Sequence, residues 1–235
     1  MGKRRQENQD CFLLALTEES EGSVFVVCDG MGGARAGGVA SKLAAETFLE
    51  SCQARLAEEG DPSPEEIVGA AARQANVRLR ERSAADPNCR GMGTTLVGGV
   101  YRGGRAALIN VGDSRAYLVR GGSIERVTTD HSLVEELVIH GALTREQARA
   151  HPRKNVVTRA LGVDPAMTGD VYTLDLEPGD LMILCSDGLS NTMTDGEILG
   201  LALAFAEPEM LCQELLALAL QRGAPDNVTA VALAL

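Results

Sequence analysis

The feature that most constrains this chain is a repeated pattern in which an apolar, strand-like run ends at an aspartate. Ser23–Asp29 reads SVFVVCD, Ala106–Ser114 reads AALINVGDS, and Leu181–Asp187 reads LMILCSD. Near the termini the order is reversed, because Asp10 and Asp226 each precede an apolar run. A carboxylate beside a strand that is buried on both faces is costly unless something compensates it. Five such residues predict convergence on one spot, provided that their strands share one sheet or two facing sheets.

Strand-like runs and helical periodicity divide the chain into blocks. Between residues 95 and 127 the runs follow one another through short Gly-containing links, which is typical of antiparallel hairpins. Helical stripes precede and follow this block over about 39–56, 64–81, 198–205 and 211–218. Ser63 with Glu66, and Thr194 with Glu197, are capping pairs for the second and third of these helices. Helices on both sides of a block of hairpins indicate a layered α+β sandwich. The predicted strands are Cys11–Leu16, Val24–Cys28, Thr95–Val100, Ala106–Val111, Ala116–Val119, Ser123–Val127, Leu181–Cys185 and Val228–Leu235.

Residues 130–162 differ from the rest of the chain. Thr144 starts a short helix there, and the stretch HPRKNVVTRALG is basic and mostly irregular. We interpret about 130–162 as a flap subdomain on the sheet. Because no internal repeat, low-complexity tract or linker is visible, we predict a single domain over residues 1–235.

Composition excludes several classes of protein. The formal net charge of −11 argues against nucleic acid as a partner, since that binding depends on basic patches. No apolar segment reaches the length of a membrane span. No secretory signal is visible, so we expect a cytoplasmic protein whose six cysteines are reduced. None of these cysteines forms a CxxC pair, so the sequence predicts neither a zinc site nor a redox motif.

The clustered aspartates favour a site for hard divalent cations. Neighbouring carboxylates repel one another, and some must take up protons unless a cation is present. The three histidines all lie in the presumed flap, so the ligand set is oxygen-only, which suits Mg²⁺ or Mn²⁺. Gly30 would let its backbone carbonyl approach such an ion closely. Two ions about 3.5–4 Å apart can lower the pKa of a bridging water and aim it at phosphorus.

Seven stretches, taken in order, resemble the motifs of the metal-dependent protein phosphatases of type 2C, in the form common in bacteria. They are GKRRQENQD, VFVVCDGMGG, GMGTT, NVGDSRAYLVR, HPRKNVVTRALG, CSDGLSN and PDNVT. The resemblance runs from Gly2 to the C-terminus. It implies a four-layer α/β/β/α sandwich of two antiparallel sheets flanked by helices, with a binuclear Mn²⁺ or Mg²⁺ centre between the sheets. It also implies hydrolysis of phosphoserine and phosphothreonine in proteins.

The resemblance implies roles for individual residues. Arg5 matches the phosphate-binding arginine, because it precedes Asp10 by five residues, and Arg4 is the second candidate. Asp29 matches the ligand that bridges the two metals. The other implied ligands are Asp10, directly or through a water, the Gly30 carbonyl, Asp187 and Asp226 on opposite metals, and Asp113 on a third, weaker metal.

The chain departs from the family pattern at four places. Met31 stands where animal members carry a histidine proposed as general acid, so a metal-bound water or solvent must protonate the leaving oxygen. Asn191 replaces an Asp found in part of the family, which bears on the third metal. Gln9 replaces a Glu, which alters a contact to a water. The family also has a strand before the position of Gly2, so either the start was placed late or one edge strand is absent.

Other interpretations remain open at this point. Each aspartate taken singly is a turn former or a cap. The fold could serve a regulator that binds phosphoproteins without turnover, or a phosphohydrolase with an aspartate nucleophile. His131 after Asp130 suggests a catalytic dyad, but we expect a hydrogen bond that anchors the flap. For a phosphatase we expect a monomer whose partners are phosphorylated proteins, including a Ser/Thr protein kinase and its substrates.

Overall fold

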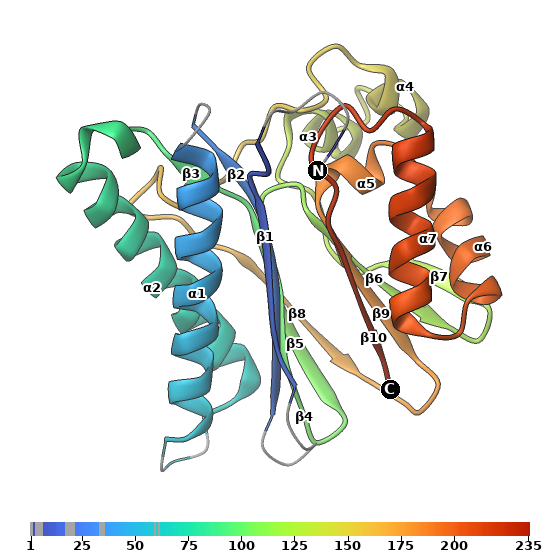
Figure 1. Ribbon diagram of the computed structural model, residues 1–235, viewed down its shortest axis with the longest axis horizontal. Coiled ribbons are helices and arrows are strands. Elements are labelled where there is room, and N and C mark those ends of the chain that lie inside the picture. The colour runs from blue at the N-terminus through green and yellow to red at the C-terminus, as the bar shows by residue number, and fades with distance from the viewer. Residues whose placement is uncertain (1, 3–6, 17–21, 33–35, 59, 61) are drawn as a thin grey trace.

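Two antiparallel β-sheets face each other, and helices cover the outer face of each sheet (Figure 1). The computed structural model describes residues 2, 7–16, 22–32, 36–58, 60 and 62–235. The first sheet has the order β1 (Asp10–Ala15), β2 (Ser23–Met31), β4 (Leu96–Arg102), β5 (Arg105–Val111) and β8 (Asp170–Asp175), and β3 (Gly93–Thr94) pairs with β2. The second has the order β10 (Ala230–Ala234), β9 (Leu181–Cys185), β6 (Arg115–Arg120) and β7 (Ser123–Arg126). The predicted α/β/β/α sandwich is confirmed.

The helices form two outer layers and a cluster at one end of the sheets. α1 (Ala36–Leu56) and α2 (Pro64–Ala85) cover the first sheet, and a 3-10 turn, Pro87–Cys89, follows α2. α6 (Asp195–Ala204) and α7 (Pro208–Gln221) cover the second sheet. The short helices α3 (Leu133–Ile139), α4 (Arg145–Ala150) and α5 (Asp187–Ser190) lie together at one end of the sandwich (Figure 1).

Side-chain alternation along β2 explains why this strand is apolar on both faces. Val24 and Val26 pack in the cluster beneath α1 and α2, whereas Phe25 and Val27 pack between the two sheets. Successive strand residues point to opposite faces, so β2 joins two apolar layers. A third cluster, which contains Ile183 of β9, lies between the second sheet and its helices.

Capping residues start the helices where the sequence predicts. The Ser63 side chain accepts from the Glu66 amide, and the Glu66 carboxylate accepts from the Ser63 amide, which completes a capping box. The same reciprocal pair opens α4 and α6. The residues are Thr144 with Gln147, and Thr194 with Glu197.

The structure corrects some predicted elements. β9 has the predicted bounds, but β10 begins at Ala230 rather than at Val228. β8 and α3 were not predicted; α3 lies within residues 130–162, where we expected a flap, and β8 follows that region in the sequence. β8 occupies the sheet edge, and its side chains alternate between half-buried and exposed, so its apolar signal is weak.

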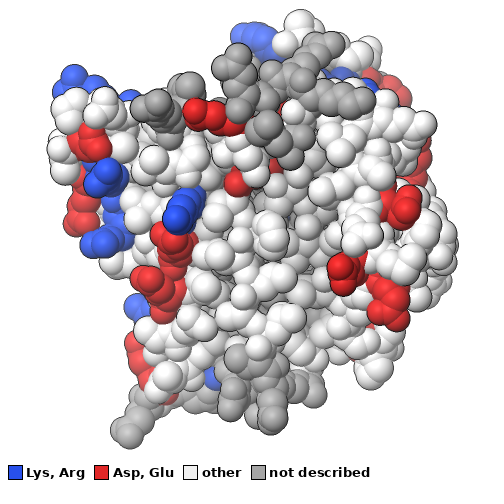
Figure 2. All heavy atoms as spheres, in the orientation of Figure 1, with Lys and Arg blue, Asp and Glu red and all other residues white. Residues whose placement is uncertain are grey.

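Charged side chains of both signs are interspersed along α1 and α2, and a mostly uncharged surface runs between the two helical layers (Figure 2). On the described residues of this face, no continuous basic stretch is visible of the kind that nucleic-acid binding requires. Within the described ranges, every helix is too short or too polar to span a lipid bilayer.

Replacing Phe25 should show how much of the stability comes from the layer between the sheets. Phe25 is fully buried, so Phe25→Ala should lower the free energy of unfolding by about 3–5 kcal/mol. Phe12 on β1 is 53% exposed, and Phe12→Ala should cost less than about 1 kcal/mol. Urea unfolding followed by circular dichroism measures both values. Equal losses in the two variants would contradict this account of the core.

Candidate functional site

The predicted aspartates converge at one end of the two facing sheets. Asp10 opens β1 and lies directly opposite Asp29 near the end of β2. Side chains of directly opposed residues share one face of an antiparallel pair, with Cβ atoms about 4.5–5.5 Å apart. Asp187 opens α5 immediately after β9, and Asp226 lies in the loop before β10, the neighbour of β9. Strand register therefore brings two carboxylates together within one sheet, and adjacent strand ends supply two more from the other sheet.

Asp10 joins the first sheet to the second. Its Oδ2 atom accepts hydrogen bonds from the hydroxyl groups of Ser186 at 2.8 Å and Thr229 at 2.7 Å. Ser186 and Thr229 are themselves linked, because the Ser186 amide donates to the Thr229 carbonyl. The other oxygen of Asp10, Oδ1, is buried without a hydrogen-bond partner among the described residues. Sequence reasoning missed the roles of Ser186 and Thr229, although both lie inside the quoted motifs CSDGLSN and PDNVT.

Burial and mutual repulsion raise the carboxyl pKa values at this site. Burial, followed by the charges of Asp10, Asp187, Asp113 and Asp226 in that order, raises the pKa of Asp29 to about 10. Burial and then Asp187 raise the pKa of Asp113 to about 8. Burial, followed by Asp226 and Asp10, raises the pKa of Asp187 to about 6. All five aspartates therefore act on one another, as the sequence predicts.

Asn191 supports Asp187. Its Nδ2 group donates to Asp187 Oδ2 at 3.0 Å, while Asp187 Oδ1 is buried without a hydrogen-bond partner in the described part of the chain. An aspartate at position 191 would add a further negative charge beside Asp187. The asparagine that departs from the family pattern instead stabilises the ionised form of its neighbour.

Glycines permit the close backbone approaches that the site requires. A Cβ on Gly30 would lie 2.0 Å from the Gly37 carbonyl oxygen, and one on Gly188 would lie 1.8 Å from that of Asn227. The Gly30 amide donates to the Gln9 carbonyl, but the Gln9 amide donates to Asn227 Oδ1 at 2.9 Å. The Gln9 amide, which would pair with the Gly30 carbonyl in a regular antiparallel ladder, thus bonds Asn227 instead.

Asn227 anchors the segment that leads into β1. In addition to its bond with the Gln9 amide, its Nδ2 group donates to the Glu7 carbonyl at 3.1 Å. The predicted phosphate-binding residue, Arg5, and the second candidate, Arg4, lie outside the described residues. Anchoring of Glu7–Gln9 fixes the stretch that immediately follows them.

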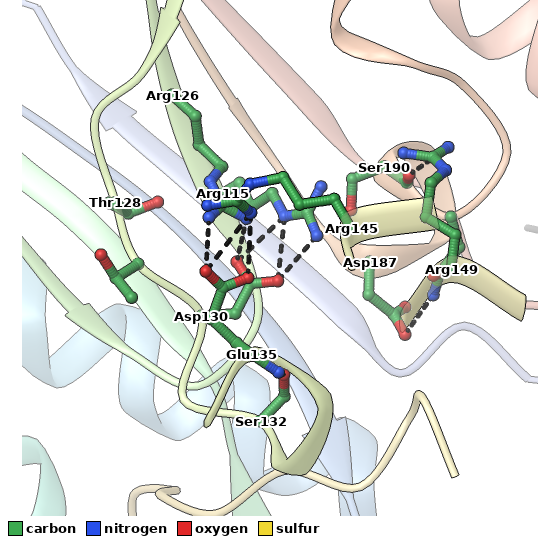
Figure 3. A network of polar contacts seen from close by, with 12 residues as sticks. Arg115, Arg126, Thr128, Asp130, Ser132, Glu135, Arg145, Arg149, Asp187 and Ser190 are labelled. Carbon is green, nitrogen blue, oxygen red and sulfur yellow. Dashed lines mark hydrogen bonds and ion pairs between the residues drawn. The ribbon is translucent and has the colours of Figure 1, made fainter. Parts of the chain in front are cut away.

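A network of ion pairs, buried except at Arg145, joins α3 and α4 to the second sheet beside the site (Figure 3). Arg115 binds Asp130 through two guanidinium nitrogens at 2.9 and 2.7 Å, and Arg126 and Arg145 donate to Glu135 at 2.9 and 3.3 Å. These residues line a cavity of about 120 Å³ that Asp113 and Asp187 also line. Lys154 lines the same cavity, and its charge lowers the pKa of Asp187 against the larger effect of burial.

The donor set fits a divalent cation. Asp10 Oδ1 and Asp187 Oδ1 are buried acceptors without partners among the described residues, and such atoms cost free energy unless a cation or a donor meets them. The charges of both Asp10 and Asp187 raise the pKa of Asp29, so the three carboxylates lie close together. Within the described ranges, no three carboxylate, imidazole or thiolate groups already surround one point as ligands do. The orphaned oxygens and the oxygen-only chemistry match a hard ion such as Mn²⁺ or Mg²⁺.

Comparison with known proteins assigns the chain to a family. A family model described as protein phosphatase 2C matches residues 3–217, and the chain belongs to this family of metal-dependent phosphatases. It is 34% identical over 201 residues to the serine/threonine phosphatase stp of Listeria monocytogenes, a match that covers 84% of this chain and 78% of that protein. The resemblance found in the motifs is confirmed.

Solved structures share the whole fold. The serine/threonine phosphatase PstP/Ppp of Mycobacterium tuberculosis superposes with a TM-score of 0.87 at 34% identity, covering 98% of this chain and 93% of that chain. The catalytic domain of PstP in complex with two manganese ions gives a TM-score of 0.84 at 33% identity, with coverage of 98% and 93%.

Removing the carboxylate of Asp130 should destabilise the protein strongly. The Asp130 side chain is 6% exposed and that of Arg115 is 17% exposed, so Asp130→Ala leaves a buried guanidinium without its carboxylate. We expect a loss of about 3–5 kcal/mol in the free energy of unfolding. The exposed pair Lys42–Glu46 provides the control, and Glu46→Ala should cost less than about 1 kcal/mol. A loss below 1 kcal/mol in Asp130→Ala would show that the network is not stabilising.

Proposed function

We propose that this chain hydrolyses phosphoserine and phosphothreonine in proteins at a binuclear Mn²⁺ or Mg²⁺ centre. The observation that carries the proposal is the meeting of Asp10 and Asp29 from one sheet with Asp187 from the other, where two buried carboxylate oxygens lack partners among the described residues. Membership in the protein phosphatase 2C family, and the two manganese ions of the related PstP structure, support the same centre.

The residues proposed to hold the ions are those whose charges act on one another. Burial and the charges of four other carboxylates raise the pKa of Asp29, and we assign it as the ligand shared by both ions. Bound ions of this kind neutralise phosphate charge and make solvent a stronger nucleophile at neutral pH. The further ligands are Asp10, the Gly30 carbonyl, Asp187 and Asp226, with Asp113 as the ligand of a third, weaker ion.

Other residues bind and orient the phosphorylated substrate. Arg5 is proposed to bind the phosphate oxygens, since Asn227 anchors the segment between it and Asp10. A guanidinium donates to two phosphate oxygens at once, which fixes the phosphate orientation. Met31 ends β2 beside the site and has no exchangeable proton. The leaving oxygen therefore takes its proton from solvent.

The proposal also covers the domain organisation, the substrates, the oligomeric state and the location of the enzyme. We assign residues 1–235 to one phosphatase domain in which about 130–162 form a flap beside the site. The substrates are phosphorylated proteins, and we propose a Ser/Thr protein kinase and its targets among them. We further propose a monomer located in the cytoplasm. The related Stp and PstP proteins, both serine/threonine phosphatases, support phosphorylated proteins as the substrates.

Replacement of Asp29 should abolish turnover while leaving the fold intact. Asp29→Asn removes the proposed shared ligand, and activity toward p-nitrophenyl phosphate and a phosphothreonine peptide in Mn²⁺ should fall by about 10²-fold or more. Each 1.4 kcal/mol of lost transition-state stabilisation is worth tenfold, and the ions supply several kcal/mol. Asp175→Asn is the matched control, because the Asp175 side chain is 95% exposed on β8, and it should retain full activity.

Three results would contradict the proposed function. Wild-type protein that binds Mn²⁺ and phosphopeptide without turnover would be a phosphoprotein-binding regulator. A phosphoenzyme trapped by rapid quench would indicate an aspartate nucleophile. Full activity in Asp29→Asn would contradict the assignment of Asp29 as the shared metal ligand.

Binding of Mn²⁺ should strengthen as the pH rises from 6 to 8. The pKa values of Asp187 and Asp113 are raised to about 6 and about 8, so protons compete with the ion across this range. Raised carboxyl pKa values also mean that the folded state holds more protons than the unfolded state, so the metal-free protein loses stability as the pH rises above about 4. The increase in melting temperature on adding Mn²⁺ should therefore be larger at pH 8 than at pH 6. An equal increase at both pH values would argue against these carboxylates as ligands.

A further inference from the structure

Two consecutive residues, Asp130 and His131, hold the loop that carries Asp113 from both sides. The Gly112 amide donates to His131 Nδ1 at 3.2 Å, and the His131 amide donates to the Gly112 carbonyl at 2.8 Å. On the other side of Asp113, the Arg115 guanidinium binds the Asp130 carboxylate. Gly112 has a φ of +111°, a left-handed conformation suited to glycine, so the loop turns sharply just before Asp113.

The hydrogen bond from Gly112 fixes the protonation of the His131 ring. A backbone amide can only donate, so Nδ1 must be unprotonated and Nε2 must carry the hydrogen. Nε2–H then donates to Asp170 Oδ2 at 3.1 Å, and Arg159 Nη1, which binds the same carboxylate, lies 3.3 Å from Nε2. His131 is 5% exposed and both of its ring nitrogens are engaged. The Asp130 carboxylate pairs with Arg115 and Arg126 rather than with the His131 ring, which argues against a catalytic Asp130–His131 dyad.

Asp170 is in turn held from the far end of the proposed flap. Arg159 Nη1 donates to Asp170 Oδ1 at 2.9 Å. Although burial raises the pKa of Asp170, the hydrogen bonds from His131 and Arg159 and the charge of Arg159 hold it below its usual value. The His131 main chain contacts the same segment, because the Thr158 amide donates to the His131 carbonyl at 2.8 Å. The predicted anchoring hydrogen bond of His131 is confirmed.

We infer that His131 is a positioning residue for Asp113, and that Asp170 and Arg159 orient its ring for this task. The inference rests on the proposed function, in which Asp113 is a ligand of the third ion. The chain of contacts runs from Arg159 through Asp170 and His131 to the Gly112 amide, next to Asp113. The His131 imidazole thus positions Asp113 and joins the loop that carries Asp113 to the end of the flap.

Calorimetric titration with Mn²⁺ tests the inference on the full chain. His131→Ala removes the acceptor for the Gly112 amide and the donor to Asp170, and the dissociation constant of the weakest Mn²⁺ site should rise about 10-fold, as loss of an outer-shell partner does at other metal sites. The tighter sites should change by less than about twofold. His131→Asn keeps a short-chain acceptor and should give a smaller rise. His140→Ala is the control, because His140 is exposed on the flap, and it should match wild type.

Nitrogen-15 NMR of the histidine rings gives a readout that is independent of metal and activity. His131 should show the tautomer with hydrogen on Nε2, and hydrogen exchange at the Gly112 amide should accelerate in His131→Ala. Hydrogen on Nδ1, or an unchanged weakest Mn²⁺ site in a folded His131→Ala protein, would overturn the inference. If His131→Ala does not fold, Asp170→Ala should raise the same dissociation constant, and an unchanged value would overturn the inference equally.

Asp113→Asn separates this inference from the proposed function. If wild type binds no Mn²⁺ and does not hydrolyse phosphopeptides, the proposed function fails. If Asp113→Asn loses the weakest site while His131→Ala keeps it, the proposed function stands and only the role of His131 fails.

Discussion

The repulsion among buried carboxylates at one end of the sandwich is the constraint on which the site depends. Asp10 and Asp29 are forced together by strand register, and the end of the second sheet adds Asp187 to the pair. Protons or cations must offset the resulting charge, since burial and then this repulsion raise the pKa of Asp29. Because two carboxylate oxygens have no donor in the described part of the chain, hydrogen bonds alone do not complete the compensation.

Those features that depend on neighbours in the sequence were predictable. Apolar runs that end in aspartate predicted most of the strands and the strand ends that meet at the acidic site. This worked because a strand buried on both faces leaves a continuous apolar signal. Capping residues gave the starts of α2, α4 and α6 for the same local reason. The convergence of the five aspartates followed from these strands once they were placed in facing sheets.

Features that depend on pairing between distant segments were not predictable in the same way. Ser186 and Thr229 bind Asp10 across more than 170 residues of sequence, and nothing local marks them as its donors. β8 is an edge strand whose exposed side chains dilute its pattern. In the sequence, His131 suggested a catalytic dyad with its neighbour Asp130. Its actual partners, Gly112 and Asp170, are distant in the sequence and become visible only in the fold. Arg5 and Arg4 lie outside the described residues, so Arg5 remains a prediction from its spacing to Asp10.

The separation of the acidic site from the apolar clusters lets one chain tolerate so much buried charge. The clusters on either side of β2 and behind the second sheet supply the apolar burial, whereas the carboxylates lie at strand ends, where repulsion strains little regular structure. Asp130 and His131 hold the loop that carries Asp113 against this repulsion, through a guanidinium on one side and a backbone amide on the other. An ion that binds only the folded carboxylate cluster adds its binding free energy to folding, so the feature that destabilises the metal-free protein becomes a source of stability once the ion is bound.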